Sequence, residues 1–170
     1  MGDNKPEGVS REQLRTLAEN LIEGQSTMTL ATAQGDAAWA APVYYVFCRS
    51  AFYFFSNPES RHIRESLTSC QAAAAIHAGA SSWEEIRGVQ MSGSIDMVSG
   101  KLEGVEAIGK YLKKFGFTKD FFSKDQAMDL DAFAKRFHVR LYKFRPTLIY
   151  YLDNSIRFGF REAINIGKQG

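Results

Sequence analysis

Cysteine and proline are both scarce in this sequence. The chain of 170 residues contains 2 cysteines and 4 prolines. Cys48 and Cys70 are too few for a disulfide framework, and their spacing is not that of metal ligands. We therefore expect a reducing compartment and no metal site. A chain of this length can bury roughly 70% of its surface, so a hydrophobic core is sufficient to stabilise it.

Long apolar runs and an excess of charge of one sign are absent as well. There are 21 Lys and Arg residues against 19 Asp and Glu residues, which gives a net charge of +2. No run approaches the ~20 apolar residues of a membrane span, and the first residues lack the apolar segment of a secretory signal. We expect one cytoplasmic domain over residues 1–170, which binds neither a membrane nor a nucleic acid.

Aromatic residues, in contrast, are abundant, with 13 Phe, 7 Tyr and 2 Trp. They are a weak indication of a flat ligand, because Phe and Tyr also favour strands and packed cores. Lysines 110, 113, 114 and 119 alternate with aromatic residues, a pattern that could stack nucleic-acid bases. Because the net charge is close to zero, a solvated helix face is the favoured interpretation.

Hydrophobic periodicity and turn residues predict a mainly β chain with inserted helices. Ser10 and Gln13 have capping-box spacing, and Asn57 followed by Pro58 predicts the start of a second helix. The predicted helices cover residues 10–23, 57–70, 101–115 and 130–135. The predicted strands cover residues 27–33, 37–48, 51–55, 71–78, 84–99, 137–144 and 147–152, and a loop with a last extended piece covers residues 154–160. Gly88 and Gly93 predict bulges or bends in the longest strand, so we expect a closed or nearly closed antiparallel barrel with helices at its openings.

The start of the second helix carries an unusual pair of basic side chains. Arg61 and His62 lie in the first turn, where the helix dipole favours anions. A bound phosphate would resolve this conflict, since amides, dipole and guanidinium would all point to one dianion. An ion pair between Arg61 and Glu65 on an exposed helix face explains the pattern equally well.

The three histidines do not form a recognisable metal-binding pattern. His62, His77 and His138 are far apart in the sequence and have no partner at zinc-ligand spacing. A haem ligand is left open on these grounds.

Four segments in this order resemble a known family. They are Thr27 to Ala33, Ala40 to Phe47, Phe52 to Asn57 leading to Ser60-Arg61-His62, and Ile86 to Gly93. Together they resemble the pyridoxamine 5′-phosphate oxidase-like FMN-binding split barrels. Within that superfamily the chain is most similar to an uncharacterised bacterial branch, which shares the Arg61-His62 pair, Asp153-Asn154 and Phe158-Gly159.

The resemblance implies a homodimer with FMN at two sites between the subunits. Pro42, Val43 and Tyr44 would lie along the isoalloxazine edge, and Phe55, Ser56 and Asn57 near the ribityl chain. Arg61 matches the phosphate-binding arginine of the family, whereas His62 stands where many members have lysine. Gln90 matches a glutamine that contacts the flavin.

The resemblance implies an FMN-dependent oxidoreductase that acts on a small planar substrate or a nicotinamide donor. True pyridoxamine phosphate oxidases carry an Arg-x-His pair near the C-terminus, and the segment from Asn154 to Arg161 contains no histidine. The substrate is therefore not necessarily a form of vitamin B6. The alternative is a split barrel that binds flavin or haem without turnover, and no residue is singled out as a catalytic acid or base.

The strands over residues 37–55 also predict an assembly. They carry Tyr and Phe on both faces, more than the interior of one small barrel covers. We expect their outer faces to be buried against a second copy of the chain by two-fold symmetry.

Overall fold

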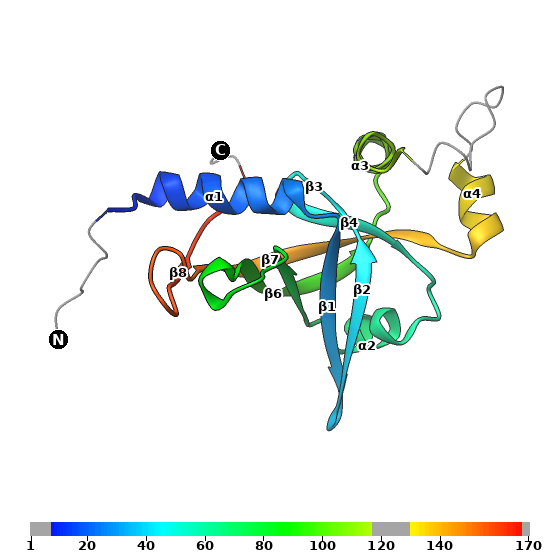
Figure 1. Ribbon diagram of the computed structural model, residues 1–170. Coiled ribbons are helices and arrows are strands. Elements are labelled where there is room, and N and C mark those ends of the chain that lie inside the picture. Colours follow the sequence, from blue (N-terminus) through cyan, green and yellow to red (C-terminus); the bar gives the residue numbers. More distant parts are fainter. Residues whose placement is uncertain (1–7, 117–129, 168–170) are drawn as a thin grey trace.

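An antiparallel sheet forms the centre of the molecule in the computed structural model, which describes residues 8–116 and 130–167 (Figure 1). The strands are β1 (Thr27–Gln34), β2 (Ala37–Tyr44), β3 (Val46–Cys48), β4 (Ala51–Ser56), β5 (Ala72–His77), β6 (Arg87–Met97), β7 (Arg140–Asp153) and β8 (Arg161–Ala163). Their order across the sheet is β2-β1-β5-β6-β7-β4-β3, and β8 pairs with β7. The predicted mainly β, antiparallel architecture is confirmed.

The sheet curls into a half-barrel because its two ends are joined by one residue, Tyr45. β2 and β3 lie at opposite ends of the strand order but are consecutive in the chain. The Tyr45 ring is fully buried and its hydroxyl donates to the carbonyl of Ile22 (2.5 Å). Tyr45 and Val46 are both buried, which breaks the in-out alternation of a strand. The predicted single strand over residues 37–48 is therefore wrong, since the chain changes partner strand at this corner.

β7 also differs from the prediction of two strands separated at Arg145 and Pro146. It is continuous, and a register shift between Ser92 and Gly93 of β6 absorbs Thr147 as an extra residue. Gly93 lies opposite Pro146, where a Cβ would overlap the Arg145 carbonyl. The bulge expected at Gly93 is thus confirmed, and it lets proline remain inside the strand.

The helices are α1 (Arg11–Gly24), α2 (Arg61–Ser69), α3 (Lys101–Lys114) and α4 (Leu130–Phe137), with a short 3₁₀ turn, η1 (Trp83–Glu85). Ser10 and Gln13 form the predicted capping box of α1. The lysines of α3 are not all solvated, because Lys114 Nζ donates to the carbonyl of Gln25 (2.6 Å) and Lys110 Nζ to that of Phe47 (3.4 Å). Lys119 lies outside the described residues. Within the described ranges, no helix has both the length and the apolar composition to cross a bilayer.

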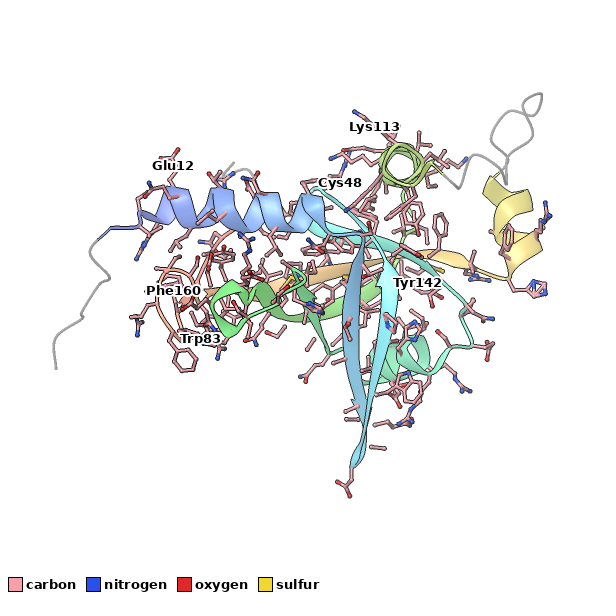
Figure 2. The ribbon with its side chains drawn as sticks, viewed as in Figure 1. Glu12, Cys48, Trp83, Lys113, Tyr142 and Phe160 are labelled. Atoms are coloured by element: carbon pink, nitrogen blue, oxygen red, sulfur yellow. The ribbon has the colours of Figure 1, made fainter. Side chains whose placement is uncertain are left out.

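Two hydrophobic cores occupy opposite faces of β4. Phe52 and Phe54 join the main core inside the curled sheet, which α1 closes with Leu14, Ala18, Leu21 and Ile22. Ala51 and Tyr53 join a second core that packs under α3, with Cys48 on the same side (Figure 2). The outer face of β4 is therefore covered by α3 of the same chain. The expectation that a second copy covers it is wrong for β4, whereas Ala38, Ala40, Pro42 and Tyr44 of β2 are exposed.

Candidate functional site

The turn between β4 and α2 brings four of the predicted site residues together. The Asn57 side chain accepts a hydrogen bond from the amide of Glu59 (2.8 Å), and the amide of Ser60 donates to the Asn57 carbonyl (3.0 Å). Helix α2 therefore begins at Arg61, with Ser60 as its N-cap. The predicted start at Asn57 and Pro58 is wrong because the Asn57 side chain closes a turn rather than capping a helix.

The Arg61 side chain extends from the first turn of α2 toward β2. Its Nε donates to Oε1 of Glu65 (2.6 Å), and its guanidinium carbon lies 4.9 Å from the centre of the Trp39 ring. Nη2 is 3.5 Å from the carbonyl oxygen of Ala37. The guanidinium thus bridges the start of α2 and the start of β2.

Glu65 is the buried anchor of this arrangement. Only 4% of the residue is exposed, and its Oε2 accepts a hydrogen bond from the hydroxyl of Thr32 (2.6 Å). The hydrogen bonds from Thr32 and Arg61 lower the pKa of Glu65 below its ordinary value. The ion pair with Arg61 is therefore confirmed, but its carboxylate is buried rather than on an exposed face.

His62 turns back toward the end of β4. Its Nε2 is 2.8 Å from the Ser56 hydroxyl and 3.3 Å from the Ser60 hydroxyl. Partial burial lowers the pKa of His62 below its ordinary value, although the nearby Glu65 opposes this. The neutral imidazole is favoured, and with the proton on Nδ1 it accepts a hydrogen bond from Ser56.

Pro42, Val43 and Tyr44 form the far end of β2, a strand that pairs with β1 on one side. The amide of Tyr45 still donates to Ser26 (3.2 Å). Since successive backbone groups of a strand alternate in direction, the nitrogen and carbonyl of Pro42 point away from β1, and proline removes no ladder bond here. Val43 faces the main core, and Tyr44 packs edge-on against Phe115 (5.2 Å).

Gln90 lies on the outer face of the sheet, in the same cross-strand row as Pro42. The register runs Pro42–Thr29, Thr29–Ala75, Ala75–Gln90 and Gln90–Tyr150. Side chains that lie directly opposite one another share a face. Gln90 is three strands away from Pro42, about 14 Å at the usual strand spacing.

Phe55 is separated from this group. Its ring packs edge-on against Tyr111 of α3 (5.2 Å, 86°), whereas Ser56 faces His62 on the other side of β4. The structure therefore joins Ser56, Asn57, Arg61 and His62 in one cluster, and leaves Pro42, Tyr44 and Gln90 on the outer sheet face. Thr32 and Trp39 were missed, because only the fold places the β1–β2 hairpin against α2.

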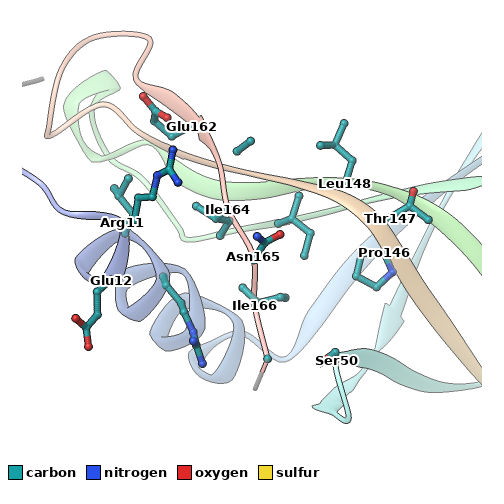
Figure 3. Close-up of a pocket in the computed structure, with 15 residues that line it drawn as sticks. Arg11, Glu12, Ser50, Pro146, Thr147, Leu148, Glu162, Ile164, Asn165 and Ile166 are labelled. Carbon is teal, nitrogen blue, oxygen red and sulfur yellow. The ribbon is translucent and has the colours of Figure 1, made fainter. Parts of the chain in front are cut away.

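One pocket lies away from the predicted site residues, and another includes two of them in its wall. One, of about 630 Å³, lies between the start of α1, the middle of β7 and residues 162–167 (Figure 3). Arg11 and Arg15 in its wall are balanced by Glu12 and Glu162, and none of the predicted site residues lines it. The other, of about 750 Å³, includes Phe55 and Asn57 in its wall.

Comparison with known proteins supports the family resemblance. No family model matches the chain. A UPF0306 protein of Klebsiella pneumoniae is 26% identical over 140 residues, which cover 81% of this chain and 84% of that protein.

Solved structures identify the fold. A heme-binding protein from Mycobacterium smegmatis matches 91% of this chain with a TM-score of 0.68 and 17% identity, and this chain covers 59% of its length, less than two thirds. A FAD-binding protein from Mesorhizobium loti matches 79% of this chain and 90% of its own, with a TM-score of 0.58 and 17% identity. A Listeria innocua protein, provisionally described as a pyridoxamine 5′-phosphate oxidase, matches 82% of this chain and 98% of its own length, with a TM-score of 0.59 and 16% identity.

The fold is therefore that of the pyridoxamine 5′-phosphate oxidase-like split barrels, whose members in this comparison include flavin-binding and heme-binding proteins. The curated sequence relatives of this chain are bacterial UPF0306 proteins.

Proposed function

We propose that this protein is a homodimeric FMN-binding flavoprotein, an oxidoreductase acting on a small planar substrate that is not necessarily a form of vitamin B6. The observation that carries the proposal is the cluster of Ser56, Arg61 and His62 at the start of α2, beside the β2 strand. The free thiols of Cys48 and Cys70 support a cytoplasmic location.

The phosphate of FMN would bind at the start of α2. No side chain caps the first-turn amides of α2, and its first turn contains no acidic residue. Glu65 accepts from Nε of Arg61, and the carbonyl of Ala37 accepts one weak bond from Nη2, so the remaining N–H groups of Nη1 and Nη2 can form a fork to a phosphate. The ion pair and the phosphate contact are thus compatible, and Glu65 would orient Arg61. Neutral His62 would contribute a hydrogen bond rather than a full charge.

The isoalloxazine would lie along β2, from Pro42 to Tyr44. Trp39, which contacts Arg61, and Pro42 are about 10 Å apart along the strand. The carbonyl of Pro42, which points away from β1, would face the ring, and Val43 holds the strand against the core. Bound FMN would supply the electron exchange, and these residues would fix its position and orientation.

Gln90 makes the second copy part of the site. At about 14 Å from Pro42 in the same chain, it is too far to contact a ring held along its own β2 edge. Two-fold symmetry would instead present Gln90 to the flavin held by the partner subunit. The outer face between them carries small side chains, among them Ala31, Ala40, Ala73 and Ala75, and a surface without bulky side chains suits a close subunit contact.

FMN titration of the purified protein tests this proposal. We expect quenching of flavin fluorescence that saturates at one FMN per chain, and bleaching of the bound flavin by NADH or NADPH. Saturable binding without bleaching by any nicotinamide would retain the flavin site and contradict a nicotinamide-linked oxidoreductase.

A haem-binding or non-catalytic split barrel is the second candidate, because one similar structure is described as a heme-binding protein and another, from Vibrio cholerae, as a heme storage protein. Haemin titration distinguishes it. A Soret band that saturates at one haem per chain, together with failure to bind FMN, would favour this candidate.

A further inference from the structure

A pocket of about 750 Å³ lies where β4 ends and β7 begins, between α3 and α4, and we call it the β4–α4 pocket. Its volume lies in the range of small-molecule sites. Most of its wall is apolar, formed by Phe55, Met97, Val98, Ile108, Val139 and Leu141. Phe55 and Met97 are the side chains suited to contact an aromatic ring, through the ring edge and the thioether sulfur.

Two cations, Lys135 and Arg140, line the β4–α4 pocket, and Glu59 is its acidic residue. The imidazole of His138 lines it as well. Nη1 of Arg140 lies 3.4 Å from the sulfur of Met97, which is a weak hydrogen-bond acceptor. The guanidinium therefore retains donors for a stronger acceptor, such as a carboxylate.

His138 is held in position by the end of α4. Its backbone has φ +53°, in the left-handed region, and the amide of Val139 donates back to Ala134 (3.0 Å). Glycine is the usual residue at this position of a helix end, so a histidine here is unfavourable for the backbone. Its Nδ1 donates to the carbonyl of Lys135 (2.8 Å), which leaves Nε2 of the neutral imidazole as an acceptor. The fold thus places an imidazole, flanked in sequence by Lys135 and Arg140, at an unfavourable backbone position in the pocket wall.

We propose that the β4–α4 pocket binds a small aromatic carboxylate, with the ring against Phe55 and Met97 and the carboxylate toward Arg140 and Lys135. The apolar wall favours an aromatic ring in the ligand, and the two cations against one carboxylate favour a negatively charged group on it. Arg61 and His62 do not line the pocket, whereas Asn57 of the proposed phosphate cluster lies in its wall, so the pocket adjoins that cluster.

The test is a calorimetric titration of the purified full-length protein with 2-naphthoate, with 2-naphthalenemethanol as the neutral probe of similar shape. We expect saturable binding of 2-naphthoate and at least tenfold weaker binding of the alcohol. R140Q should weaken 2-naphthoate binding about tenfold or more, because a hydrogen bond to a charged group is lost. M97W should abolish binding by filling the pocket, and since Met97 is 46% exposed this substitution should leave the fold intact.

Arg157, an exposed arginine on the loop between β7 and β8, provides the matched control. R157Q should bind 2-naphthoate as the parent does. No binding by the parent, equal binding of both probes, or equal effects of R140Q and R157Q would overturn the proposal. Competition between FMN and 2-naphthoate would also overturn it, because the pocket would then belong to the flavin site. Binding of 2-naphthoate with no effect of FMN supports it, whether or not the proposed flavin function holds.

Discussion

Replacement of Arg61 separates the proposed phosphate contact from the ion pair seen in the structure. Nε of Arg61 is already bonded to Glu65, so a phosphate would meet the Nη groups. A hydrogen bond between charged groups contributes about 1.5–3 kcal/mol. R61A should therefore lower FMN affinity about ten- to a hundredfold, since each ~1.4 kcal/mol is a factor of ten. R61K should fall between the parent and R61A, because it retains a charge but loses the fork.

The assay is fluorescence titration with FMN and with riboflavin, which lacks the phosphate. Riboflavin affinity should be unchanged in R61A, so the ratio of the two affinities isolates the phosphate contact. The control is R64A, because Arg64 is exposed on the same helix. R61A should also melt at a lower temperature than R64A, since the buried Glu65 carboxylate keeps Thr32 but loses its cation.

Two results would show that Arg61 does not bind the phosphate. If R61A binds FMN and riboflavin as the parent does, Arg61 is solely the partner of Glu65. If R61K loses FMN and riboflavin equally while its melting temperature matches the parent, Arg61 does not recognise the phosphate.

Three further predictions concern stability and assembly. T32V removes a hydrogen bond that lowers the pKa of Glu65. A carboxyl group with a lowered pKa stabilises the fold at pH values above its pKa in the unfolded chain, and this stabilisation is lost on acidification. In urea titrations T32V should therefore be less stable than the parent at pH 7 and lose less stability between pH 6 and pH 3, and an equal loss in both proteins would contradict this. G93A should destabilise the protein by about 3 kcal/mol or more because a Cβ would overlap main-chain atoms of β7. The control is G109A, in helix α3 with nothing within 4 Å of its Cβ, which should stabilise the protein by about 0.5–1 kcal/mol. Equal effects of the two substitutions in chemical denaturation would show that the bulge tolerates a side chain. Light scattering should give a dimer mass for the parent and a monomer mass for A75R, which places a charge on the outer sheet face; a dimer in both would exclude that face as the interface.

Most of the fold could be predicted from local pattern. The capping box of α1 and the β1–β2 hairpin each depend on residues close in sequence. Gly93 marked the bulge correctly, although the extra residue, Thr147, lies on the paired strand. The corner at Tyr45 could not be predicted, because an apolar run does not show where one strand exchanges its partner. The start of α2 was misplaced because an asparagine before proline can close a turn as readily as it caps a helix.

The candidate site could be predicted in part. The i,i+4 spacing of Arg61 and Glu65 gave the ion pair, but not the burial of its carboxylate. That burial depends on Thr32, 33 residues away in sequence, and on packing of α2 against the β1–β2 hairpin. The separation of Gln90 from Pro42 likewise follows from strand order, which single-sequence patterns do not specify.

The absorption spectrum of the purified protein, recorded with added FMN after removal of unbound ligand, is the decisive measurement for the proposed flavin site. We expect a yellow protein that retains one FMN per chain, released by heat or acid. A colourless protein after the same treatment, or one that acquires only a Soret band when haemin is supplied, would contradict it.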